Sequence, residues 1–162
     1  MPAAETAYRN ALRLDPDVYG VVAYADFLID QHRPRDALAL LKDQPRTDVV
    51  LLRLAIAGTQ ARSPGAARDV AEMRDRIALA NERPDARKFH GREQAMFALA
   101  VDRAPTLALE LARGDVEQQR EPLDLLVLAR AARATGDVAA LDEARRLRRS
   151  IGLHDRRIDA LL

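Results

Sequence analysis

The sequence contains no cysteine and no tryptophan, and it has no long run of apolar residues. Without cysteine there can be no disulfide framework, thiolate zinc site, iron–sulfur cluster or cysteine nucleophile. A membrane-spanning helix needs about 20 consecutive apolar residues, and no stretch approaches that length. Residues 1–5 lack the features of a signal peptide. We therefore expect a soluble protein, and the absence of cysteine does not choose between cytoplasm and periplasm.

Aromatic residues are also scarce, at 4% of the chain, although apolar residues of all kinds make up 48%. Alanine and leucine must then build the core, which favours closely packed helices over sheets. The net charge of +1 provides no overall field to attract nucleic acid or an acidic membrane. The only lysines are Lys42 and Lys88. Almost all positive charge is therefore carried by arginine, which pairs well with carboxylates.

Helical periodicity is the one strong pattern in the sequence. Apolar or small residues recur three and four positions apart, as at Ala4, Ala7, Tyr8 and Ala11. No segment has a convincing strand pattern. The spacing predicts helices over residues 4–14, 17–31, 34–43, 48–61, 64–81, 86–103, 105–118, 122–135, 137–150 and 155–161.

The eight prolines support this division, because each lies at a predicted junction. A proline inside a helix costs about 3 kcal/mol, whereas one at the first helical position costs little. Ser63 and Pro64 are expected to cap and begin a helix. Gly136 is expected to end one helix and Asp137 to cap the next, and Gly152 to end the penultimate helix.

The first helical segment carries the most specific motif. It has a small residue at Ala4, an aromatic residue at Tyr8, an alanine at Ala11 and a terminal Pro16. This pattern resembles the second helix of a tetratricopeptide repeat (TPR), a helical hairpin of about 34 residues. Further units begin near residues 17, 47, 85 and 122, so the resemblance covers nearly the whole chain. Their lengths are uneven and none has the full family signature, which indicates a divergent array.

The resemblance implies an all-α fold in which antiparallel helical hairpins stack as a TPR-like right-handed solenoid, an alpha-alpha superhelix. It implies a single domain over residues 1–162. The chain opens on a second helix that lacks its first, and half a hairpin leaves an apolar face uncovered. We therefore expect this chain to be the C-terminal part of a longer protein, whose upstream residues would include any signal peptide.

Few residues suggest catalytic chemistry. His90 and Glu93 are three residues apart on one predicted helix face, as in half of a metal site. A catalytic zinc needs three protein ligands, however, and His32 and His154 lie in distant turns. The sequence has neither a Gly-x-Ser-x-Gly elbow nor a glycine-rich phosphate loop. A pair of carboxylates brought together by folding stays an open alternative. We expect no metal, no cofactor and no enzymatic activity.

Repeat geometry provides the candidate binding residues. In a TPR array the first helix of each hairpin lines the concave face, where solenoids commonly bind. The resemblance places in a groove on this face Tyr19, Asp26, Asp30, Gln60, His90, Glu93, Arg130 and Arg133. The groove would be acidic at one end and basic at the other. The alternative is that several of these residues occupy ordinary solvated or packing positions.

Together these features predict a protein–protein interaction module that captures a peptide or protein segment whose identity the sequence does not reveal. One alternative is a structural domain that self-associates into a homo-oligomer. The other is nucleic-acid binding through the arginine-rich C-terminal end, which has no aromatic residues for stacking and is therefore disfavoured. The arginines concerned are Arg145, Arg146, Arg148, Arg149, Arg156 and Arg157.

Overall fold

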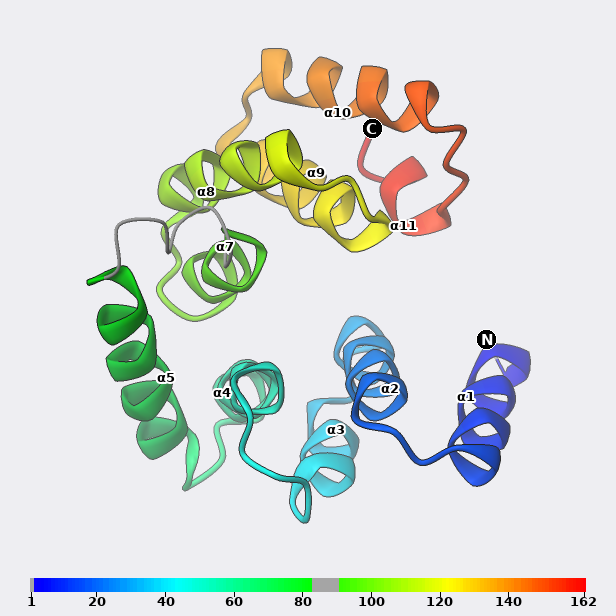
Figure 1. Ribbon diagram of the computed structural model, residues 1–162, viewed down its shortest axis with the longest axis vertical. Coiled ribbons are helices and arrows are strands. Elements are labelled where there is room, and N and C mark those ends of the chain that lie inside the picture. Colours follow the sequence, from blue (N-terminus) through cyan, green and yellow to red (C-terminus); the bar gives the residue numbers. More distant parts are fainter. Residues whose placement is uncertain (1, 83–90) are drawn as a thin grey trace. The chain divides into compact units, whose positions relative to one another are not determined.

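The computed structural model describes residues 2–82 and 91–162, and within these ranges it contains ten helices and no strand (Figure 1). The predicted all-α class is therefore confirmed. The helices are α1 (Pro2–Leu14), α2 (Val18–Asp30), α3 (Pro34–Leu41), α4 (Asp48–Ala61), α5 (Ala66–Asn81), α7 (Gly91–Ala100), α8 (Pro105–Gln118), α9 (Pro122–Thr135), α10 (Val138–Ser150) and α11 (Arg156–Asp159).

The helix boundaries follow the signals in the sequence closely. Pro34, Pro105 and Pro122 are the first residues of α3, α8 and α9. Gly136 ends α9 in the left-handed region with φ 71°, and the Asp137 side chain caps α10 by accepting a hydrogen bond from the Ala140 N–H at 2.9 Å. Both positions were expected from the sequence and are confirmed, as is Gly152 after α10, at φ 65°.

The expected start of α5 is wrong, because the helix begins at Ala66 and Pro64 lies in the preceding turn. Arg62 takes a left-handed conformation with φ 53° at the end of α4. The Ser63 N–H then donates to the Gly58 carbonyl at 3.0 Å. Ser63 thus closes the end of α4, and the turn continues to Gly65 before α5 starts.

Internal packing divides the chain into two compact units, which we call unit 1 (Met1–Arg76) and unit 2 (Ile77–Leu162). Helix α5 crosses the boundary and contributes its first part to unit 1. The expectation of a single domain over residues 1–162 stays a prediction.

Unit 1 is built around α3, which packs against both α2 and α4, while α2 and α4 also contact each other. Small residues at the contacts allow close approach: Ala25, Ala37 and Ala57 are fully buried. Larger side chains fill the space between the helices. They are Val21, Val22, Leu28, Leu41, Val50 and Leu54.

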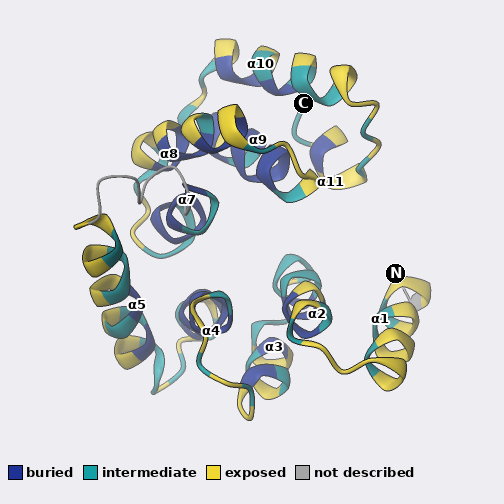
Figure 2. Cartoon of the chain, in the orientation of Figure 1, coloured by how far each residue is buried: buried dark blue, intermediate teal, exposed yellow. Residues whose placement is uncertain are grey.

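Within unit 1, helix α1 contacts the other helices through aromatic side chains and one carboxylate, and most of its surface is exposed (Figure 2). The Tyr8 ring stacks on Tyr24 with centroids 5.4 Å apart and contacts Phe27 at 5.3 Å. The chain has three tyrosines and three phenylalanines, and three of these six rings meet in this cluster. Glu5 accepts hydrogen bonds from the Tyr24 hydroxyl at 3.0 Å and from Arg33 at 2.7 Å.

Unit 2 repeats the packing order of unit 1. Helix α8 packs against both α7 and α9, and α7 also contacts α9. Helix α9 is buried along most of its length (Figure 2), since α10 and α11 contact it as well. Ile158 of α11 is fully buried and anchors the C-terminal turn.

Two glycines of unit 2 provide a matched test of this packing. At Gly91 an added Cβ would lie 2.9 Å from Asp115 Cβ and 3.2 Å from the Leu111 carbonyl oxygen, whereas at exposed Gly114 it would meet nothing within 4 Å. We expect Gly91→Ala to lower the free energy of unfolding by about 1–3 kcal/mol. Gly114→Ala should raise it by about 0.5–1 kcal/mol through helix propensity. Urea unfolding measures both, and equal effects would contradict the close approach of α7 and α8.

Candidate functional site

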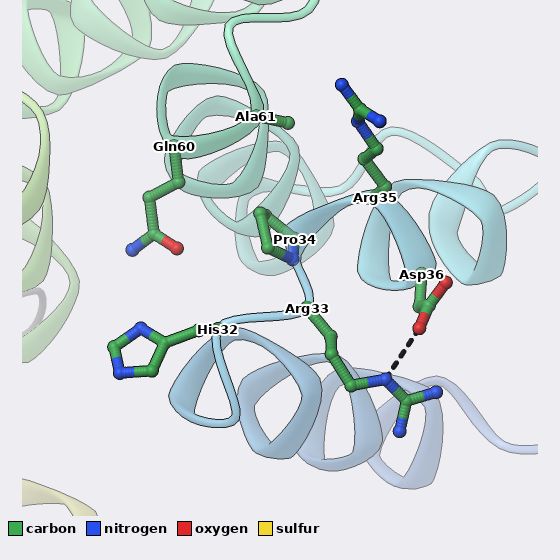
Figure 3. A pocket seen from close by; sticks show the side chains of 7 residues that line it. All are labelled: His32, Arg33, Pro34, Arg35, Asp36, Gln60 and Ala61. Atoms are coloured by element: carbon green, nitrogen blue, oxygen red, sulfur yellow. Dashed lines mark hydrogen bonds and ion pairs between the residues drawn. The ribbon is translucent and has the colours of Figure 1, made fainter.

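One candidate site is a pocket of about 400 Å³ in unit 1, between the α2–α3 turn and the end of α4 (Figure 3). The side chains of His32 and Gln60 point to the same side of it, and Arg35 rises beside Ala61 (Figure 3). Its lining residues are His32, Arg33, Pro34, Arg35, Asp36, Gln60 and Ala61.

A tight turn builds one wall of this pocket. His32 takes a left-handed conformation with φ 56°, and the Arg33 N–H donates to the Leu28 carbonyl at 2.9 Å. This closes the last turn of α2 and reverses the chain, after which Pro34 begins α3 with its backbone angle already set. The turn therefore leaves the imidazole of His32 in solvent at the rim.

Arg33 belongs to the wall rather than to the binding face. Its Nε donates to Asp36 at 2.6 Å and its Nη1 donates to Glu5 at 2.7 Å. The hydrogen bond from Arg33 holds the pKa of Glu5 below its ordinary value, although burial acts in the opposite direction. The guanidinium is thus neutralised by groups of unit 1 and fastens α1 to the turn.

The other polar groups of the pocket are hydrogen-bond donors that face solvent. His32, Arg35 and Gln60 are exposed. Within residues 2–82 and 91–162, no hydrogen bond or ion pair engages their side chains. With Arg33 and Asp36 paired, Arg35 gives the pocket a positive charge. The pocket therefore suits an anionic or hydrogen-bond-accepting group.

Of the candidate groove residues in unit 1, Gln60 alone lines this pocket. Tyr19 is 79% exposed at the start of α2. Asp30 is half-buried near the end of α2 and interacts with other groups of the protein. Asp26 turns toward α4 and is engaged in an ion pair.

That ion pair joins Asp26 to Arg53 through two hydrogen bonds. Arg53 Nε and Nη2 donate to the two carboxylate oxygens at 2.9 and 2.8 Å, and Arg53 is only 2% exposed. Such a two-bond geometry is the strongest form of arginine–carboxylate contact. The sequence contains a signal for it, because Arg53 is the single charge within the apolar run 49–58. A charge in such a run has to be paired when it is buried.

The candidate residues of unit 2 are more scattered. Glu93 is half-buried and pairs with the neighbouring Arg92 at 3.1 Å. On α9, Arg130 is half-buried with an interaction partner, and Arg133 is exposed in the last turn. His90 lies outside the described residues.

Unit 2 also contains a buried acidic cluster around Arg92, which sequence reasoning missed. Arg92 Nη1 donates to Asp124 Oδ1 at 2.9 Å and to Glu121 at 2.8 Å, while the Arg92 backbone N–H donates to Asp115 Oδ1 at 3.1 Å. Asp115 and Asp124 are each 1% exposed. Asp115 stands where the buried face of α8 otherwise has apolar residues such as Leu111, and that spacing is the signal in the sequence.

The protonation of this cluster is unusual. Burial raises the pKa of Asp124 to about 6, the Glu121 backbone N–H lowers it, and the adjacent Asp115 carboxyl raises it again. Burial by itself would lower the pKa of Arg92, but the carboxylates of Glu93 and Glu121 raise it above the ordinary value. The arginine therefore stays charged while the buried acids compete for it.

Several arginines of the arginine-rich C-terminal end form ion pairs with aspartates of the same unit. Arg145 pairs with Asp142 at 2.7 Å, and Arg157 pairs with Asp155 at 2.6 Å. The hydrogen bond from Arg157 lowers the pKa of Asp155. Arg148 pairs with Asp159 at 3.1 Å and so ties α10 to α11. The exposed arginines left by these pairs are Arg146, Arg149 and Arg156.

The described ranges contain no group of three or more histidine or acidic side chains placed to hold a metal ion. In the same part of the chain, no helix has both the length and the apolar character that a membrane crossing requires.

Comparison of the chain with models of protein families, with curated proteins and with solved structures yields no match.

Removal of Asp26 should reveal how strongly the Arg53 pair holds α2 to α4. We expect Asp26→Ala to lower the free energy of unfolding by about 3 kcal/mol, because Arg53 would stay buried without its carboxylate and keep the Val49 carbonyl as an acceptor. Asp43→Ala breaks an exposed pair with Lys42, at 3.8 Å, and should change stability by less than about 0.5 kcal/mol. In the double variant Asp26→Leu/Arg53→Met we expect most of the loss to be recovered. Urea unfolding of the four proteins tests this, and a small effect of Asp26→Ala would count against the pair.

Proposed function

We propose that this chain is a divergent TPR-like helical-repeat module that binds a segment of another protein through a carboxylate group. The observation that carries the proposal is the pocket of unit 1, in which His32, Arg35 and Gln60 present donors to solvent. A carboxylate can accept hydrogen bonds from all three types of donor and neutralise the guanidinium.

The helix packing supports the repeat interpretation. In both units a middle helix, α3 or α8, packs against the helix before it and the helix after it, and those two outer helices also contact each other. Stacked hairpins produce this order, because each hairpin contacts only its neighbours. In unit 1 the TPR-like motif of α1 also has a physical role, since Tyr8 packs on Tyr24 and Phe27 of the next helix.

A carboxylate ligand is favoured over an apolar one by the composition of the pocket. Pro34 and Ala61 provide its only apolar side chains, and neither is large. The aliphatic stem of Arg35 adds contact area for a peptide backbone. Both the acidic side chains of a peptide and its terminal carboxylate satisfy this chemistry, so we expect recognition of an acidic segment.

Self-association is the second candidate, and exposed apolar side chains at the α1–α2 turn favour it. Leu14 is 88% exposed and Tyr19 is 79% exposed, and only four residues separate them in the chain. Two copies of the chain that cover these side chains would bury apolar surface. Sedimentation velocity at increasing concentration of the wild type and of Leu14→Glu/Tyr19→Glu would detect such an association.

A peptide array tests the proposed binding chemistry. We expect the full chain to bind acidic segments and to bind at least about tenfold more weakly when each Asp and Glu is replaced by its amide. Separate arms with a free or an amidated C-terminus distinguish the terminal carboxylate from acidic side chains. Arg35→Glu should lose about tenfold in affinity because it reverses the charge of the pocket, and His32→Ala/Gln60→Ala should lose less.

Matched controls separate this pocket from other charged surfaces. Lys42→Glu makes the same charge change at a residue 69% exposed that does not line the pocket, and it should bind as the wild type does. Arg130→Glu/Arg133→Glu tests the candidate residues of unit 2. Loss of binding in that variant together with normal binding by Arg35→Glu, at unchanged helicity, would move the site to unit 2 and disprove the role of the pocket.

A further inference from the structure

Unit 2 places more buried acid than base around Arg92. Asp115 and Asp124 are almost completely buried. The Arg92 guanidinium donates to Asp124, whereas Asp115 accepts only from the Arg92 backbone N–H. The same guanidinium is also shared with Glu121 at 2.8 Å and Glu93 at 3.1 Å. Two buried carboxylates side by side cannot both stay ionised without a large cost, because each has lost its water and repels the other.

Hydrogen bonding shows which oxygen lacks a donor. Asp124 Oδ1 accepts from Arg92 Nη1 at 2.9 Å, and its Oδ2 accepts from the Glu121 backbone N–H at 2.7 Å. Asp115 Oδ1 accepts from the Arg92 backbone N–H at 3.1 Å. Asp115 Oδ2 is buried and meets no donor among the described residues. Such an atom normally costs free energy unless something satisfies it.

The neighbouring group is the carboxyl of Asp124, because Asp124 and Asp115 accept hydrogen bonds from the same residue, Arg92, through its Nη1 and its backbone N–H. The Asp115 carboxyl also raises the pKa of Asp124. Two carboxylates can form a hydrogen bond only when one of them carries a proton. Both oxygens of Asp124 already accept from N–H donors, whereas Asp115 Oδ2 meets none among the described residues. One proton held between the two carboxyls would satisfy this remaining buried oxygen.

We propose that Asp115 and Asp124 hold one shared proton in folded unit 2, and that this proton fastens α8 to α9 in a pH-dependent way. The charged groups that face the pair are Arg92 and Glu93 from α7 and Glu121 from the turn before α9. With the proton present, the buried pair and Arg92 together carry no net charge. Without it, they carry one uncompensated negative charge in the core of the unit.

The direction of the pH effect follows from the sign of the shift. The pKa of Asp124 is raised from its ordinary value of 3.8 to about 6. The pair therefore contributes its full stability below about pH 4, and this contribution is lost as the pH rises through about 6. Between pH 5 and pH 8, stability should fall. The paired acids Glu5, Glu72 and Asp155 have lowered pKa values and titrate below this window. This inference does not depend on the proposed binding function.

Thermal unfolding of the full chain at pH 5 to 8, followed by circular dichroism, tests the proposal. For the wild type we expect the midpoint to fall by roughly 3–6 °C across this range. Asp115→Asn replaces the shared proton with a permanent amide donor and keeps the acceptor for Arg92. We expect this variant to lose most of the pH slope and to match or exceed the wild type at pH 8.

Asp69→Asn is the matched control, because Asp69 is also buried, at 5% exposed, but it lies in unit 1 and pairs with Arg46 and Arg68. It should keep the wild-type slope. Infrared spectra of the folded wild type provide a measurement that does not need a variant. At pH 5 the wild type should show a protonated-carboxyl band in excess of that of Asp115→Asn, where ordinary acids alone contribute, and this excess should disappear by pH 8. A flat wild-type profile, no such excess, or an unchanged slope in Asp115→Asn would overturn the proposal.

Discussion

In each unit an arginine–aspartate pair with one fully buried and one half-buried side chain joins helices that are not adjacent in the chain. In unit 1 Arg53 of α4 holds Asp26 of α2, and in unit 2 Arg92 of α7 holds Asp124 of α9. A buried guanidinium that loses its carboxylate is strongly unfavourable, whereas apolar contacts between alanines are similar in several registers. The ion pairs therefore select one register from the many that an alanine- and leucine-rich core would tolerate.

Ion pairs within each unit also determine which charged side chains stay available to a ligand from outside the protein. In unit 1 Arg33 is taken by Glu5 and Asp36, and it fixes the first helix to the turn before α3. Arg35, two residues further on, lines the same pocket as His32 and Gln60 but is exposed to solvent, and Figure 3 shows it across Pro34 and Ala61 from those two side chains. Two arginines two residues apart thus have opposite roles: Arg33, just before α3, pairs within the unit, and Arg35, inside α3, is exposed. A carboxylate from outside would supply to Arg35 the partner that Arg33 finds within the unit.

The two units differ in the number of carboxyl groups placed around the arginine of each pair. Unit 1 gives its most buried arginine one carboxylate with two well-formed hydrogen bonds. Unit 2 gives Arg92 a second buried acid, Asp115, which approaches because Gly91 has no side chain in the way. The second carboxylate leaves unit 2 with one surplus negative charge, which the shared proton neutralises. This proton lies where α7, α8 and α9 meet. The packing of unit 2 therefore depends on pH through this carboxyl pair, whereas Asp26 in unit 1 has no second buried acid beside it among the described residues.

The sequence by itself determined the helices and most of their ends. Helical periodicity, prolines at first positions, Gly136 and Asp137 act over four residues or fewer, so they can be interpreted without knowledge of the fold. Even here the start of α5 was misplaced, because Ser63 closes α4 through a bond to Gly58. Only the tertiary structure decided that Asp26 would be bound to Arg53, that Gln60 would line a pocket with His32, and that Asp115 would meet Asp124. These partners are separated by roughly ten to thirty residues along the chain, and whether they meet depends on how whole helices pack, which no local pattern specifies.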